Sequence, residues 1–186
     1  MPHGRTLIEP SSTALVIVDL QEKLLPAIGN AESVVSNVKN LLRLAQALDL
    51  KTLVTTQYRK GLGDTVSEIA ELVGVAPLDK ICFGCMNDES FRDALAKVLP
   101  QGGTVLLAGI ETHICVMQTA LGALEAGYQV HAVSDATGSR VPANAGLGIQ
   151  RMRDAGAVIS STEMAIYELL RDSRRPEFKQ MLPYLK

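Results

Sequence analysis

Short, uniformly apolar runs alternate along this chain with longer stretches whose apolar residues recur at helical spacing. Residues 14–18 have the sequence Ala-Leu-Val-Ile-Val, whereas between residues 32 and 48 the apolar side chains return at helical intervals. A strand with one face in water would alternate apolar and polar residues, so uniformly apolar strands indicate a parallel sheet with helices on both faces. We therefore predict an α/β fold with three layers, α/β/α, around a mostly parallel sheet of about six strands.

The expected elements follow this alternation along the whole chain. Strands are predicted at 14–18, 51–56, 80–83, 104–109, 129–134 and 158–161. Helices are predicted at 32–48, 65–73, 90–99, 115–126, 144–155 and 162–171. No linker or repeat interrupts the pattern, so we predict a single domain over residues 1–186. Residues 176–186 are expected to form a C-terminal tail that packs across the domain or onto a neighbouring subunit.

The composition argues against several classes of protein. Hydrophobic residues make up 47% of the chain, yet its longest apolar runs fall far short of the roughly 20 residues of a membrane span. Residues 1–6 resemble neither a signal peptide nor a transit peptide, so we expect a cytoplasmic protein. The net charge of −2 gives no surplus of lysine and arginine for nucleic acid. The three cysteines, an odd number, do not indicate a disulfide framework.

Polar side chains gather where the predicted strands end. Asp19 ends the first strand, Gln57 follows the second, Lys80 lies near the start of the third, and residues 111–115 follow the fourth. In open parallel sheets, ligands bind beyond the carboxyl ends of the strands, near the switch in strand order. We therefore expect a carboxylate, an amide, an ammonium group and a thiol to meet at one site.

Cys115 is the candidate nucleophile of this site. It is predicted to open a helix, where free backbone N–H groups and the helix dipole would lower the pKa of its thiol and hold an oxyanion. By position alone, a small residue packing the helix against the sheet is an equally good interpretation. Likewise, Asp19 alone would cap a turn and Lys80 alone would be a surface lysine. Together they favour catalysis, with Asp19 as general base and Lys80 as the cation that lowers the pKa values of both anions.

Three other motifs offer alternatives. Cys82 and Cys85 form a C-x-x-C pair, which would suit a redox or metal site but lacks suitably spaced partners, so packing or pocket lining is favoured. His113 is close enough in sequence to be the base for Cys115, although neighbours in a tight turn rarely align. Asp135 is interpreted as structural, capping its turn or pairing with Arg140. No motif supports a nucleotide cofactor.

Several of these segments resemble the isochorismatase-like cysteine hydrolases. The resemblance covers nearly the whole chain, and the run Gly-Ile-x-Thr-x-x-Cys-Val at 109–116 is its most specific part. Other matching segments lie at 15–21, 55–58, 79–83, 126–130 and 134–140. The resemblance implies that Asp19, Lys80 and Cys115 form a catalytic triad. It also implies a non-proline cis peptide between Ile110 and Glu111, and an oxyanion held by the backbone N–H groups of Glu111 and Cys115.

Two departures narrow this expectation. Isochorismatases proper lack the cysteine, so Cys115 favours hydrolysis of an amide or related acyl compound. Nicotinamidases carry an Asp/His metal site after the second strand, whereas residues 57–60 contain no histidine, so no metal and no cofactor are predicted. The chain looks most similar to isochorismatase-domain-containing proteins.

We therefore expect a hydrolase of a small amide or related carbonyl substrate, with Gln57, Tyr58, Phe83 and Ile110 lining its pocket. The rival interpretations are a non-catalytic binding or scaffold protein with the same fold, and a redox protein that uses Cys82 and Cys85. The predicted partners are a small-molecule substrate and further copies of the chain, without nucleic acid or membrane. The resemblance implies a homo-oligomer, and the apolar tail around Phe178, Met181, Leu182 and Tyr184 is a candidate interface.

Overall fold

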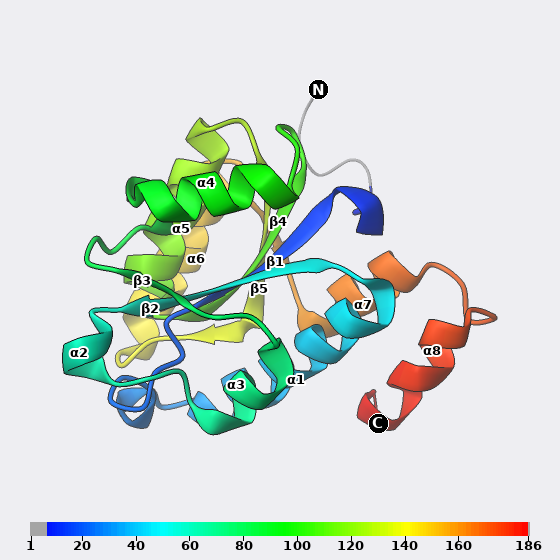
Figure 1. The fold of residues 1–186 in the computed structure, drawn as a ribbon, viewed down its shortest axis with the longest axis horizontal. Coiled ribbons are helices and arrows are strands. Elements are labelled where there is room, and N and C mark those ends of the chain that lie inside the picture. The colour runs from blue at the N-terminus through cyan, green and yellow to red at the C-terminus, as the bar shows by residue number, and fades with distance from the viewer. Residues whose placement is uncertain (1–6, 186) are drawn as a thin grey trace.

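The sheet contains six strands, all parallel, in the order β3-β2-β1-β4-β5-β6. The computed structural model describes residues 7–185. The strands are β1 (Thr13–Val18), β2 (Lys51–Gln57), β3 (Leu78–Lys80), β4 (Thr104–Ile110), β5 (Gln129–Gly138) and β6 (Val158–Ser160). The α-helices are α1 (Ala31–Leu48), α2 (Arg59–Leu62), α3 (Ser67–Val73), α4 (Glu89–Val98), α5 (Met117–Glu125), α6 (Pro142–Asp154), α7 (Thr162–Leu170) and α8 (Pro176–Met181). The predicted three-layer parallel fold is confirmed (Figure 1).

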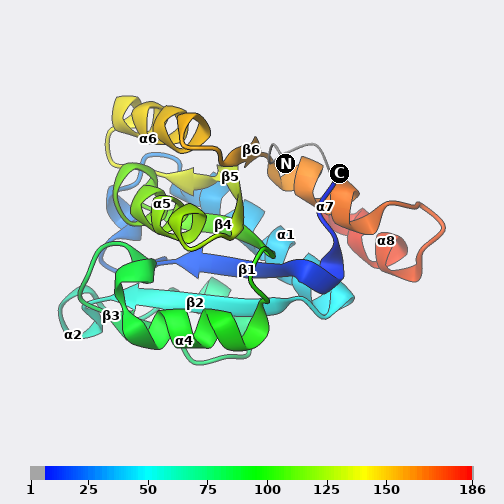
Figure 2. The same cartoon turned by 90° about the horizontal axis from the view of Figure 1, so that it is seen from above.

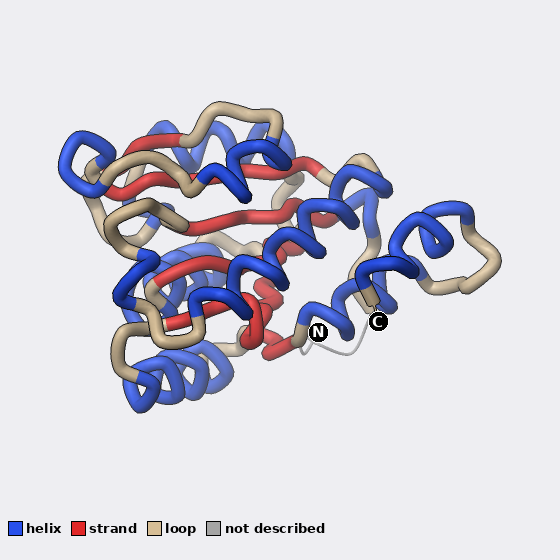
Figure 3. Tube along the Cα trace, turned by 90° about the horizontal axis from the view of Figure 1, so that it is seen from below, coloured by secondary structure: helices blue, strands red, loops and turns tan. Residues whose placement is uncertain are grey.

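The position of β1 between two layers of helices explains why its sequence is apolar throughout. Leu15 and Ile17 face the core beneath α1, α3 and α7, while Ala14, Val16 and Val18 face the core beneath α4, α5 and α6. Successive side chains of a strand point to opposite faces, so a strand covered on both sides has no position left for a polar residue. Figure 3, viewed from the α1 side, shows the helices of this layer crossing the strands.

Short 3₁₀ turns complete the connections. They lie at Pro10–Ser12, Leu25–Ala27, Cys85–Asn87 and Leu182–Tyr184. One further segment, Thr112–Val116, is a π-helical turn that leads directly into α5. Such turns are rare and occur frequently at functional sites.

The third strand differs from its prediction in a way that matters for the site. It was expected at 80–83 but runs from Leu78 to Lys80, pairing with the last three residues of β2 in the register Thr55↔Leu78 to Gln57↔Lys80. Lys80 therefore ends the strand instead of starting it. It lies at the carboxyl ends of the strands, as Asp19 does. A three-residue edge strand has too short an apolar pattern for its ends to be read from sequence.

The C-terminal segment packs on this same chain. Helix α8 lies against α1, where Met181 is buried, and the Phe178 ring contacts that of Tyr167 on α7. Asn40 on α1 donates a hydrogen bond to the Tyr184 carbonyl oxygen at 3.2 Å. Figure 2 shows α8 at the opposite end of the molecule from the carboxyl ends of β1 and β2. Of the predicted tail interface, Phe178 and Met181 thus serve the chain's own core, while Leu182 and Tyr184 keep substantial exposure.

Candidate active site

A buried ion pair lies at the carboxyl ends of β1 and β3. The Lys80 ammonium donates to Asp19 Oδ2 at 2.7 Å, and the two side chains are 1% and 0% exposed. Thr55, on β2 between these strands, donates its hydroxyl to Asp19 Oδ1 at 2.7 Å. Burial alone would lower the pKa of Lys80, but Asp19 and the nearby thiols of Cys85 and Cys115 raise it above its usual value. Lys80 is therefore an ammonium group at neutral pH.

Gln57 holds the other side of Lys80. Its Oε1 accepts a hydrogen bond from the ammonium at 2.8 Å, while its Nε2 donates to the Ile81 carbonyl oxygen at 2.6 Å. The backbone of Gln57 is fixed in turn by Gln21, which accepts from its N–H and donates to its carbonyl oxygen. The amide therefore supplies a neutral acceptor that orients Lys80 without adding a negative charge.

The turn that carries Cys115 follows β4. Gly109 precedes it with φ of +121°, and a Cβ at this position would lie 2.1 Å from the Val18 carbonyl oxygen. Only glycine permits β4 to approach the end of β1 this closely. The peptide between Ile110 and Glu111 is cis, which confirms that expectation. The N–H groups of Ile114 and Val116 both donate to the Glu111 carbonyl oxygen, whereas that of Cys115 lies between them in the π-helical turn.

The Cys115 thiol lies next to the ion pair and is 7% exposed. Burial, the charge of Asp19 and a hydrogen bond to Asp19 raise the pKa of this thiol, and Lys80 opposes them. The expectation that the helix N-terminus lowers the thiol pKa is therefore wrong. Cys115 is the fourth residue of the turn that begins at Thr112, so it is not at the helix start, and burial together with the Asp19 carboxylate raises its thiol pKa.

A cavity of ≈ 500 Å³ opens onto Cys115. Its apolar wall is formed by Leu24, Ala27, Ile28, Leu62, Phe83 and Ile114. Its polar wall is formed by Lys23, Gln57, Glu111, Gln118 and Arg140, together with Cys115. A cavity of this size, with an apolar wall facing a polar one, suits a small molecule.

The cavity wall differs in part from the predicted one. Gln57 and Phe83 line it, as predicted, but Tyr58 and Ile110 do not. Ile110 is 0% exposed and faces the core under α1, because it is the last residue of the buried strand β4. Tyr58 has φ of +43° and its ring turns back over Gly61 on α2.

Several residues that line the cavity were not predicted from the sequence. Gln118 was detectable, because it lies one helical turn after Cys115 and so shares its face. Lys23, Leu24 and Ile28 lie in the connection between β1 and α1, where no periodicity indicates which side chains turn inward. The sequence suggests Arg140 only as a partner for Asp135, but its N–H and its Nε donate to the Glu111 carboxylate at 2.9 and 3.0 Å. Asp135 instead caps α7 by accepting from Thr162 N.

The remaining motifs have structural partners. The Cys85 backbone N–H donates to Thr119 Oγ1, whose hydroxyl donates to the Cys115 carbonyl oxygen at 2.6 Å. Cys85 is buried and Cys82 half-buried, and both are free thiols. The His113 ring pairs with Ser139 Oγ at 2.9 Å. Within residues 7–185 no three His, Cys, Asp or Glu side chains lie together as a metal site would require.

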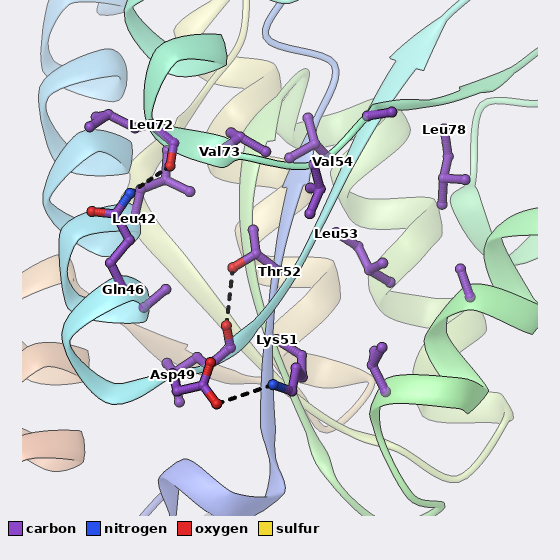
Figure 4. Close-up of a pocket in the computed structure, with 16 residues that line it drawn as sticks. Leu42, Gln46, Asp49, Lys51, Thr52, Leu53, Val54, Leu72, Val73 and Leu78 are labelled. Carbon is purple, nitrogen blue, oxygen red and sulfur yellow. Dashed lines mark hydrogen bonds and ion pairs between the residues drawn. The ribbon is translucent and has the colours of Figure 1, made fainter.

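A second cavity, of ≈ 460 Å³, lies along β2 toward its amino-terminal half (Figure 4). Leu42 of α1, Leu72 and Val73 of α3, and Leu53 of β2 point into it. Its charged groups are Asp49 and Lys51, which pair with each other at 3.2 Å. Cys115 thus lines the first cavity and not this one. Across the described residues 7–185, no helix is long and apolar enough to cross a membrane.

The chain resembles known proteins over nearly its full length. It is 40% identical over 186 residues to isochorismatase domain-containing protein 2A of Mus musculus, covering 98% of this chain and 86% of that protein. Its fold matches a structure described as MAR1 ribonuclease from Caenorhabditis elegans, with a TM-score of 0.89, 35% identity and coverage of 97% and 92%. It also matches YcaC from Pseudomonas aeruginosa with hexane-2,5-diol and covalent acrylamide, with a TM-score of 0.89, 28% identity and coverage of 97% and 92%. The family model of the isochorismatase domain matches residues 13–164, and the chain therefore belongs to the isochorismatase family.

Proposed function

We propose that this chain hydrolyses a small amide or related acyl compound, with Cys115 as nucleophile, Asp19 as general base and Lys80 as the charge that holds the carboxylate. The observation that carries the proposal is the buried Asp19–Lys80 pair beside the thiol that lines the cavity. A buried ion pair is costly to build and weak as a source of stability, so its retention next to a nucleophile favours a chemical role.

The reaction starts from a neutral thiol. When the substrate carbonyl enters, the thiol proton passes to the Asp19 carboxylate and the Cys115 sulfur attacks the carbonyl carbon. The carbonyl oxygen becomes an oxyanion, which the backbone N–H groups of Glu111 and Cys115 stabilise. The carbon–nitrogen bond then breaks, Asp19 returns the proton to the leaving nitrogen, and a thioester remains.

Water completes the cycle. Asp19 takes a proton from the water, whose oxygen attacks the thioester carbon, and the carbon–sulfur bond breaks. The proton on Asp19 returns to the sulfur and restores the thiol. Lys80 keeps its charge throughout, because its pKa is raised, and so stabilises each state in which Asp19 or the sulfur is anionic. The YcaC relative described with covalent acrylamide supports the presence of a reactive nucleophile in this fold.

The proposal is tested by locating the reactive thiol and its product. Iodoacetamide followed by peptide mapping is expected to label Cys115 ahead of Cys82 and Cys85. A panel of small amides and esters is expected to release acid product with the wild type and none with Cys115→Ala. If Cys82 or Cys85 is alkylated while Cys115 stays inert, the nucleophile assignment fails.

The same substrate panel and one thiol–disulfide exchange assay separate the rivals. A scaffold protein would show no difference between wild type and Cys115→Ala on any substrate. A redox protein would lose thiol–disulfide exchange in Cys85→Ser. RNA is included in the panel because of the description of the Caenorhabditis elegans neighbour, and RNA cleavage that survives Cys115→Ala would contradict a shared cysteine mechanism.

A further inference from the structure

Two cationic side chains, Lys23 and Arg140, line the same cavity as Cys115. They come from separate connections, Lys23 after β1 and Arg140 after β5, so the fold brings both to the cavity from different parts of the chain. Neither has a role in the thiol chemistry proposed above.

The Arg140 guanidinium is oriented by Glu111, but only one of its nitrogen atoms makes hydrogen bonds to residues 7–185. Its Nε donates to both oxygens of Glu111, at 3.0 and 3.2 Å, and its backbone N–H donates to Glu111 Oε2. Glu111 is 9% exposed, so this carboxylate is fixed and already engaged. The hydrogen bonds of Arg140 within the described part of the chain all go to Glu111, so the two terminal NH₂ groups of this cavity-lining, largely exposed side chain remain available as donors.

Lys23 adds an uncompensated charge. Its ammonium donates to the Gly61 carbonyl oxygen at 2.9 Å, which uses one of three N–H groups and neutralises nothing. Elsewhere at the site the charges cancel in pairs, Asp19 with Lys80 and Glu111 with Arg140. The cavity therefore carries about one net positive charge through Lys23.

We infer that the substrate is an anionic acyl compound whose carboxylate binds between Arg140 and Lys23 while its scissile carbonyl lies at Cys115. This inference rests on the proposed function and names its substrate class. The paired NH₂ groups of a guanidinium match the planar geometry of a carboxylate, and the ammonium adds charge without demanding direction. The apolar wall formed by Leu24, Ile28 and Ile114 suits a short hydrocarbon spacer between the two groups.

The test uses two electrophiles that share one reacting group. N-acryloylglycine carries a carboxylate beyond its acrylamide, and N-(2-methoxyethyl)acrylamide is a neutral molecule of similar length. The rate at which each labels Cys115 is measured by mass spectrometry and divided by its rate with β-mercaptoethanol. We expect the anionic reagent to label Cys115 about tenfold faster on this scale, and the advantage to shrink as salt is added.

Variants assign the preference to the two cations. The ratio of the corrected labelling rate of the anionic reagent to that of the neutral reagent measures the preference. Arg140→Gln and Lys23→Gln are each expected to reduce this ratio at least about threefold. Lys23 contacts a backbone carbonyl, so its variant leaves the Glu111–Arg140 pair intact even if Arg140→Gln disturbs folding. Lys51→Gln removes the same charge at the other end of β2 and is expected to leave the ratio unchanged.

The outcomes separate this inference from the proposed function. Labelling of Cys115 by both reagents without an anionic preference overturns the carboxylate site and leaves the nucleophile standing. A preference that survives both Arg140→Gln and Lys23→Gln overturns the site as well. No labelling of Cys115 by either reagent overturns the proposed nucleophile, and this inference with it.

Discussion

At the scale of single residues, the protonation of Cys115 follows from neighbours that act in opposite directions. Burial and Asp19 raise its pKa, and Lys80 lowers it. The resting site therefore holds a thiol beside an ammonium group, and in the proposed mechanism the thiolate forms as the proton moves to Asp19. Gln57 leaves the positive charge of Lys80 in place, because its neutral amide oxygen accepts a hydrogen bond from the ammonium group without cancelling that charge.

Asp19→Asn is expected to make the Cys115 thiol more acidic and yet to slow turnover. The change removes the carboxylate that raises the Cys115 pKa through its charge and a hydrogen bond, so the apparent pKa of Cys115 alkylation by iodoacetamide should fall. Turnover of any amide that the wild type hydrolyses should nevertheless drop by about 10² to 10⁴, because the general base is lost.

The amide oxygen introduced by Asp19→Asn can still accept a hydrogen bond from Lys80, but the buried lysine loses its counter-charge, so the free energy of unfolding is expected to fall by about 3–5 kcal/mol and is measured beside turnover. Asp79→Asn is the matched control: Asp79 precedes Lys80 on β3 but bonds outward to Thr56 and the Arg59 N–H. An alkylation pKa that rises in Asp19→Asn, or turnover within a few-fold of wild type, would contradict the assignment.

At the scale of elements, the strands and helices were predictable wherever an apolar pattern was long enough. The buried strands β1 and β4 and the amphipathic helix α1 lie within one residue of their expected bounds. The π-helical turn at Thr112–Val116 was missed, because its residues look like the first turn of the helix that follows. The four-residue helix α2 was missed as well, because it is too short to show a period.

Gly148→Ala tests how the π-helical turn is held in place. Helix α6 crosses this turn at Gly148, where an added Cβ would lie 2.8 Å from His113 Cα and 3.1 Å from the Thr112 carbonyl oxygen. Neither atom belongs to a flexible side chain, so we expect the turn to shift, with a loss of about 1–3 kcal/mol in the free energy of unfolding. Cys115 alkylation should slow as the turn moves.

Gly146→Ala is the control on the same helix. Nothing lies within 4 Å of an added Cβ there, so the better helix propensity of alanine should stabilise the protein by about 0.5–1 kcal/mol. Denaturant unfolding and alkylation rates are measured for both variants. If Gly148→Ala behaves like Gly146→Ala in both measurements, the close packing of α6 does not position the turn.

At the scale of the whole molecule, the sequence indicated where the site lies but not its shape. The rule that ligands bind at the carboxyl ends of parallel strands placed Asp19, Gln57 and Cys115 together, and the switch in strand order falls between β1 and β4 as that rule requires. The cavity wall depends on loops, such as those of Lys23 and Arg140, whose side-chain directions follow from tertiary packing. A single domain, cytoplasmic location, self-association and the absence of a metal stay predictions.

The stability of the whole molecule should depend on pH through Cys85. Burial raises the pKa of this thiol from 9.0 to about 11, with Lys80 opposing and Asp19 adding to the shift. The folded protein therefore keeps a proton that the unfolded chain loses above pH 9. The stabilisation is fully present below pH 9 and is lost as the pH rises through 11. A shift of this size corresponds to about 3 kcal/mol.

Urea unfolding at pH 8 and pH 11, in the presence of a reductant, measures this loss. The wild type should lose about 3 kcal/mol more across this range than Cys85→Ala, whose own stability is lower at pH 8 because of the cavity it creates. Cys82→Ala, in the same loop but half-buried, serves as the control and should follow the wild type. Titrating groups remote from Cys85 are common to the wild type and Cys85→Ala and cancel in the comparison. If Cys85→Ala loses as much stability as the wild type, the alkaline limit of this fold lies elsewhere, and Cys85 contributes to the site through packing alone.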